Sequence, residues 1–179
     1  MMMKMLEAGG LPPLTDGLRE ADTDNPKGYY EFERVKQLDK GDTEWLAQAQ
    51  GKAVKVISAL LKYLPEDYAY QIVFMERDIS EVLASQRKML VHRGEDPDSV
   101  DEVKMATLFT NHVKKVKAYL AEQDNMSVLY VHYNDVLADP YPQAQSISQF
   151  LGNRPDVQAM VEIVDPNLHR NRKEMLATS

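Results

Sequence analysis

The chain has 179 residues, of which 44% are hydrophobic and 27% charged, and its formal net charge is -7. This composition predicts one globular domain over residues 1–179, large enough to bury a core. The negative charge argues against general nucleic-acid binding but leaves room for a small basic pocket. Without cysteine, disulfides and thiolate chemistry are excluded. No apolar stretch approaches the roughly 20 residues that cross a bilayer, so we expect a cytoplasmic protein without a membrane segment.

Residues 1–65 are predicted to form several short helices and one strand. Apolar spacing indicates a helix over 1–8, which a glycine pair ends, and further helices over 31–40 and 45–50. Residues 54–57 are a short apolar run that predicts a strand, and residues 58–65 predict a brief helix ended by a proline.

The second part predicts longer elements. The β-branched and aromatic run 71–75 is expected to be a strand, followed by a helix over 79–92. A long amphipathic helix over 99–122, a third strand over 127–132 and a helix over 141–151 complete the pattern. Strands separated by helices imply parallel pairing and right-handed crossovers. The expected fold is therefore an α/β domain with three layers, a parallel sheet flanked by helices.

Residues 71–89 hold the most specific pattern. Arg77 leaves the carboxyl end of a predicted strand beside a helix N-terminus, a place where α/β sheets bind ligands and backbone N–H groups favour anions. Ser85 lies two turns along that helix, so its hydroxyl is predicted to reach an anion held by Arg77. The alternative is that Arg77 pairs with Asp78 or Glu81 and that Ser85 only packs.

This Arg-Asp-x-x-x-x-x-x-Ser segment resembles the 3′-phosphate-binding segment of the sulfotransferase family. The family uses 3′-phosphoadenosine 5′-phosphosulfate (PAPS) as its donor and has a fold like that of the P-loop NTPases. The resemblance implies that Arg77 and Ser85 bind the 3′-phosphate of this co-substrate.

Further segments resemble the same family. Residues 25–31, NPKGYYE, are similar to a segment of bacterial sulfotransferase-like proteins, although a plain turn explains them equally well. Residues 130–140 resemble the end of the family's third strand, which implies that Tyr133 lies beside the adenine; the alternative is an aromatic that packs on the next helix. Near the C-terminus, Arg170 and Arg172 stand where the family adds 3′-phosphate contacts, and a solvated basic face is the alternative.

Residues 52–65 resemble the family's Lys-Thr-His strand and the helix that follows it. Lys55 holds the lysine position, which implies that it stabilises charge near the transferred group, whereas Ile57 stands at the position of the catalytic histidine. The candidates for the base are then Glu31 and Glu20. Glu31 is equally well interpreted as a first-turn acid of its own helix.

The resemblance implies transfer of a sulfuryl group from PAPS to a hydroxyl or amine of a small-molecule, glycan or peptide acceptor. The family's first strand and its Pro-x-Ser-Gly-Thr loop for the 5′-phosphosulfate have no counterpart before residues 1–8, so we expect an N-terminally incomplete fold. We also expect a nearly inactive chain, because each lost hydrogen-bond donor costs about 2.7–4 kcal/mol of transition-state stabilisation. The alternative is a non-catalytic nucleotide-binding or interaction module. Its open sheet edge would pair with a partner or a second copy, and a homo-oligomer is possible under either interpretation.

Other chemistry is not indicated. The four histidines, His92, His112, His132 and His169, lack metal-ligand spacing, so no metal site is expected. Ser58 lacks the Gly-x-Ser-x-Gly turn of a serine hydrolase.

Overall fold

Two parallel strands form the sheet in the part of the chain that this computed structural model describes, residues 1–18, 29–92, 94, 96 and 101–165. They are β1 (Tyr70–Glu76) and β2 (Met126–His132), paired from Tyr70↔Met126 to Glu76↔His132. Each is a predicted strand lengthened by one or two residues. Because the pairing is parallel and in register, both strands end at the same edge of the sheet.

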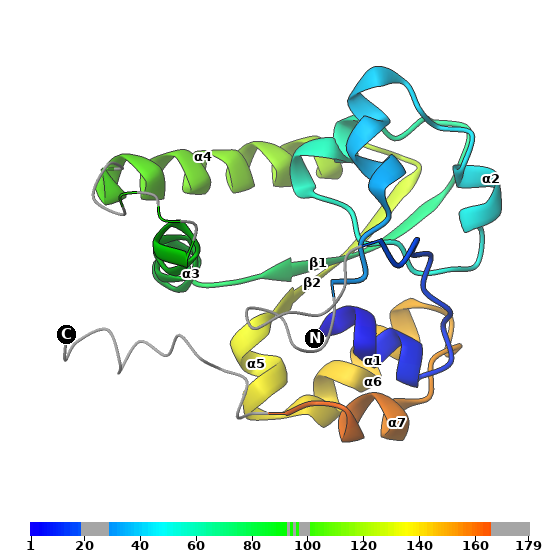
Figure 1. The fold of residues 1–179 in the computed structure, drawn as a ribbon. Coiled ribbons are helices and arrows are strands. Elements are labelled where there is room, and N and C mark those ends of the chain that lie inside the picture. Colours follow the sequence, from blue (N-terminus) through cyan, green and yellow to red (C-terminus); the bar gives the residue numbers. More distant parts are fainter. Residues whose placement is uncertain (19–28, 93, 95, 97–100, 166–179) are drawn as a thin grey trace.

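Helices surround this sheet (Figure 1). In chain order they are α1 (Met2–Ala8), the 3-10 helix η1 (Glu33–Lys40), α2 (Leu46–Ala49), the 3-10 helix η2 (Ser58–Tyr63), α3 (Ile79–His92), α4 (Glu102–Ala121), α5 (Tyr133–Ala138), α6 (Pro140–Phe150) and α7 (Val157–Glu162). All seven helices that the sequence predicts are present. The two short helices α5 and α7 were not predicted.

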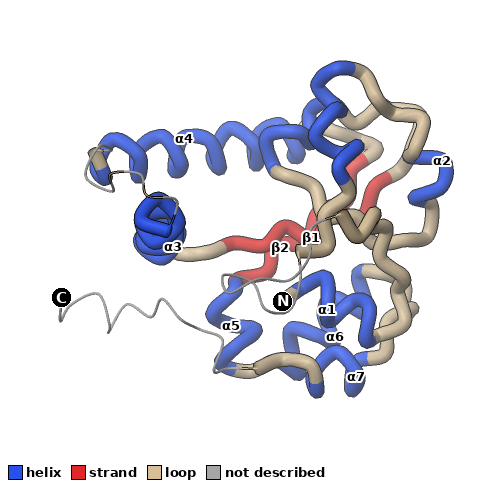
Figure 2. Tube along the Cα trace, in the orientation of Figure 1, coloured by secondary structure: helices blue, strands red, loops and turns tan. Residues whose placement is uncertain are grey.

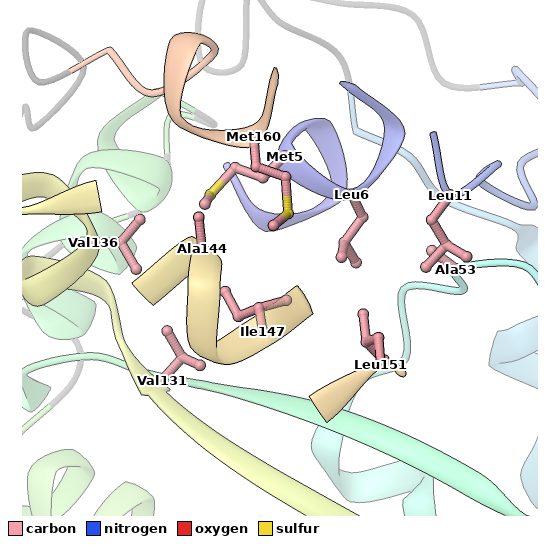
Figure 3. Close-up of a cluster of buried hydrophobic side chains, with 10 residues drawn as sticks. All are labelled: Met5, Leu6, Leu11, Ala53, Val131, Val136, Ala144, Ile147, Leu151 and Met160. Carbon is pink, nitrogen blue, oxygen red and sulfur yellow. The ribbon is translucent and has the colours of Figure 1, made fainter. Parts of the chain in front are cut away.

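The helices cover both faces of the sheet (Figure 2). One core cluster lies on the side of α1, α5, α6 and α7, and Val131 of β2 contributes to it with Val73 and Met75 of β1 packed against it. Figure 3 shows how α1 and α6 fill this side with the fully buried Met5 and Ile147. Strands that are apolar on both faces are expected where helices cover both.

The second core cluster lies on the side of η1, η2 and α4. Phe74 of β1 and Met126 of β2 join Leu38 and Leu120 there, around a nearly inaccessible Trp45. The Trp45 indole satisfies its N–H by donating to the backbone oxygen of Asp42 at 2.9 Å. The chain is thus a mixed α/β protein with a small parallel sheet, and the P-loop-type arrangement stays a prediction.

The predicted strand over residues 54–57 is wrong. The structure has only one bridge at this place, between Ala53 and Pro13, in which Ala53 donates to the Pro12 oxygen at 2.9 Å and accepts from the Leu14 N–H at 2.8 Å. In this parallel pairing, residues 54–57 would lie opposite residues 14–17. There the Asp16 N–H donates to the Glu31 oxygen at 3.4 Å, and Thr15 Oγ1 donates to the same oxygen at 2.9 Å, so the neighbouring segment bonds to Glu31 and not to residues 54–57. Residues 54–57 therefore lie outside the sheet.

Candidate functional site

Arg77 and Tyr133 emerge side by side from the carboxyl edge of the sheet. Glu76 and His132 form the last pair of the ladder, so the next residue of each strand enters the same region. Arg77 leads from β1 towards α3, and Tyr133 is the first residue of α5. The guanidinium carbon of Arg77 lies 4.6 Å from the centre of the Tyr133 ring, which is a cation–π contact.

A buried carboxylate holds Arg77 in this position. The Arg77 Nε donates to Glu81 Oε2 at 3.2 Å, and the Glu81 side chain is only 1% exposed. Asn134, the second residue of α5, donates its Nδ2 to Glu81 Oε1 at 3.1 Å and to Asp78 Oδ2 at 3.4 Å. The pairing of Arg77 with Glu81, stated above as an alternative, is therefore confirmed.

This pairing does not exhaust the donors of Arg77. Among the described residues its only hydrogen-bond partner is Glu81, reached through Nε, so Nη1 and Nη2 remain available on a side chain that is 31% exposed. A guanidinium fixed through Nε presents its other N–H groups in a defined direction. The arrangement can therefore bind an oxyanion while the ion pair stays intact.

Tyr133 presents a neutral ring at this place. Burial raises the pKa of its phenol above the ordinary value, the charge of Arg77 lowers that pKa, and the charge of Glu81 raises it. The phenol is therefore un-ionised at neutral pH, and its ring can pack against a flat, uncharged group.

One large cavity brings four of the predicted site residues together. It has a volume of about 1360 Å³, and Arg77, Ser85, Tyr133 and Lys55 all line it. Ser85 reaches it from the face of α3, and its side chain is exposed. Small-molecule pockets usually measure about 300–1,000 Å³, so this cavity has room for a nucleotide and a second substrate.

Glu31 and Lys55 lie close to each other. Lys55 Nζ is 3.6 Å from Glu31 Oε1 and donates to the backbone oxygen of Tyr29 at 3.1 Å, while Lys36 Nζ is 3.4 Å from Glu31 Oε2. The interpretation of Glu31 as a first-turn acid is wrong, because η1 begins at Glu33. Glu31 is instead held between two lysines. The catalytic roles of Lys55 and Glu31 stay predictions.

Two contacts around the site could not be predicted from any sequence pattern. Asn134 reaches Glu81 across the sheet edge, and Ser58 Oγ lies 2.9 Å from His112 Nε2, joining η2 to α4 on the cavity wall. The partners are 53 and 54 residues apart. No short motif links residues at such separations. The other predicted site residues, Glu20, Arg170 and Arg172, lie outside the described residues.

Within the described ranges, no three His, Asp or Glu side chains are grouped so that they could hold a metal ion. In that same part of the chain, every helix is too short or too polar to cross a membrane.

Comparison with known families agrees with the geometry at the sheet edge. A family model described as the sulfotransferase family matches residues 20–156. The chain belongs to the sulfotransferase family. The match spans β1, α3 and β2 of this sulfotransferase and therefore includes Arg77, Ser85 and Tyr133. Searches of curated proteins and of solved structures found no significant match.

Proposed function

We propose that this sulfotransferase uses PAPS as its donor and binds the nucleotide half at Arg77, Ser85 and Tyr133. The acceptor is a hydroxyl or amine of a small molecule, a glycan or a peptide. The main support is the contact between Arg77 and Tyr133 at the carboxyl ends of two parallel strands, on a cavity that Ser85 also lines. Helices on both sheet faces also agree with the three-layer, P-loop-type fold of the family.

The chemistry of these side chains matches that of the ligand. In the proposed complex the Nη groups of Arg77 and the hydroxyl of Ser85 donate to the 3′-phosphate, and each charge-assisted bond contributes about 1.5–3 kcal/mol. The Tyr133 ring lies beside the adenine. Sulfuryl transfer, like phosphoryl transfer, relies on positioning and on stabilisation of the peripheral oxygens, and Lys55 on the same cavity supplies a positive charge for this.

The 3′-phosphate assignment is tested by calorimetric titration with adenosine 3′,5′-bisphosphate and with adenosine 5′-monophosphate, which lacks that phosphate. Arg77→Lys keeps a cation beside Glu81 but loses the guanidinium fork, and Ser85→Ala removes one hydroxyl. We expect each to weaken bisphosphate binding about 10- to 100-fold, the equivalent of one charge-assisted bond, with little effect on the monophosphate.

Ser80→Ala is the matched control, because Ser80 is an exposed serine of the same helix that does not line the cavity. It should bind both nucleotides as the unmutated chain does. Equal affinity of the unmutated chain for the two nucleotides, or unchanged binding by both Arg77→Lys and Ser85→Ala, would place the 3′-phosphate elsewhere. No bisphosphate binding at all would end the proposal.

A further inference from the structure

Ser58 and His112 form a hydrogen-bonded pair on the wall of the same cavity. Ser58 is the first residue of η2, and His112 lies in the middle of α4, with Ser58 Oγ 2.9 Å from His112 Nε2. Both residues line the cavity, and both are partly exposed. A solvent-accessible serine–histidine pair can pass a proton from a third hydroxyl to the imidazole.

Few other groups of this cavity can accept a proton. Its described lining contains one histidine, His112, and two carboxylates, Glu76 and Asp165. Glu76 accepts from Lys117 Nζ at 2.5 Å, and Asp165 also has an interaction partner. The remaining ionisable side chains of the described lining belong to lysine, arginine and tyrosine. His112 is thus the lining group best suited to act as a base.

Apolar residues adjoin the pair in the chain and share its cavity. Phe109 and Val113 lie on either side of His112 along α4 and line the cavity with it, and Ile57 precedes Ser58 and is 55% exposed. An uncharged acceptor that carries a hydroxyl on an apolar group fits such walls. Water is displaced from apolar walls at little cost, which strengthens polar contacts inside.

We propose that His112 accepts the proton of the acceptor hydroxyl, with Ser58 as the relay, a role that rests on the proposed function. The acceptor oxygen forms a bond to sulfur as the bond from sulfur to the donor's phosphate oxygen breaks. The acceptor's proton passes to Ser58 Oγ while the Ser58 proton passes to His112 Nε2. The products are the sulfated acceptor, adenosine 3′,5′-bisphosphate and a protonated His112.

The test compares two acceptors that differ in their need for a base. Transfer of labelled sulfate from PAPS is measured at pH 8 to benzyl alcohol, which must lose its proton, and to 4-nitrophenol, which is largely ionised already. His112→Gln keeps a hydrogen-bonding side chain at Ser58 but cannot accept a proton. We expect it to lower kcat about 10²- to 10⁴-fold with benzyl alcohol, the usual contribution of general base catalysis, and far less with 4-nitrophenol.

Two further variants separate chemistry from folding. In His112→Ala, added imidazole should restore part of the activity towards benzyl alcohol, because it fits the space that the side chain leaves. His132→Gln changes a histidine that does not line the cavity and should behave as the unmutated chain. An equal loss with both acceptors, no loss, or no recovery with imidazole would overturn the assignment and leave a hydrogen bond that only joins η2 to α4.

The outcome is also distinguishable from failure of the proposed function. Bisphosphate binding by the unmutated chain and by His112→Gln is measured first, and both should bind alike. Binding by the unmutated chain without transfer to either acceptor would match the nearly inactive chain that the sequence analysis expects, and it would refute the role of His112 in this chain while the nucleotide site stands. Absence of bisphosphate binding would remove the proposed function itself, and the proposal about His112 with it.

Discussion

Replacing Glu81 by glutamine tests whether the buried carboxylate holds the Arg77 site together. Glu81 is 1% exposed, and both of its oxygens accept hydrogen bonds, Oε2 from Arg77 Nε at 3.2 Å and Oε1 from Asn134 Nδ2 at 3.1 Å. A glutamine has one oxygen and one NH2 group. Whichever way it turns, its NH2 faces a donor, so one buried donor loses its acceptor, and such a loss costs about 1–3 kcal/mol.

A rearrangement of Asn134 reduces the loss of stability expected for Glu81→Gln. Asn134 Oδ1 is buried without a hydrogen-bond partner among the described residues, so a turn of the Asn134 amide gives the new NH2 an acceptor. The same turn removes the contact of Nδ2 with Asp78. We therefore expect the lower part of the range, about 1–2 kcal/mol. In a chain of this size that lowers the melting temperature by roughly 2–8 °C.

The assay is thermal and urea unfolding followed by circular dichroism. Glu102→Gln is the matched control, because Glu102 pairs with Arg87 on the surface and its side chain is 60% exposed. That change should stay within about 0.5 kcal/mol. A stability of Glu81→Gln equal to that of the unmutated chain would refute the reasoning. So would an Arg77→Met and Glu81→Gln double-mutant cycle in which the two effects simply add, since contacting residues couple by about 0.5–3 kcal/mol.

Two further predictions concern parts of the chain away from this pair. Gly9→Ala should destabilise the fold by about 1–3 kcal/mol, because a methyl group there would lie 2.9 Å from Met160 Cγ and 3.0 Å from Pro155 Cβ; an unchanged melting temperature would contradict this. The hydrogen bond from Arg34 lowers the pKa of Asp42, so this carboxylate adds stability above its unfolded pKa that is lost as the pH falls through its folded pKa. Below about pH 4, the stability of Asp42→Asn should fall less steeply with decreasing pH than that of the unmutated chain. The same dependence of stability on acid pH in both would argue against this pairing in solution.

The sequence was most informative where one element buries a regular face. Residues 71–75 and 127–132 are apolar on both sides because helices cover both faces of the sheet, and α3 begins and ends where the pattern predicted. Residues 54–57 have the same composition as a strand, yet the segment that would pair with them bonds to Glu31 instead, and pairing depends on that neighbour. The helix α5 was missed because it follows β2 without a loop, so its first residue was assigned to the strand end.

In the candidate site too, local sequence patterns predicted some features, whereas contacts between distant segments were missed. Arg77 was predicted from its place between a strand and a helix, and Tyr133 from the resemblance to the family. The structure brings them together because the two parallel strands end at one edge. The contacts of Glu81 with Asn134 and of Ser58 with His112 depend on how helices far apart in the chain pack. Single-sequence periodicity records which face of a helix is buried. It does not record which polar residue of another helix lies opposite.

The ion pair between Arg77 and Glu81 also bears on how an acidic chain holds an anion. A net charge of -7 gives no general attraction for a bisphosphate, so affinity depends on donors that point at the phosphate. An unpaired arginine would lose side-chain entropy each time it bound. Here Glu81 fixes Nε and Tyr133 supports the flat face, so the Nη groups are directed before the ligand arrives. At the proposed site, the ion pair with Glu81 would therefore supply the preorganisation that directed anion binding requires.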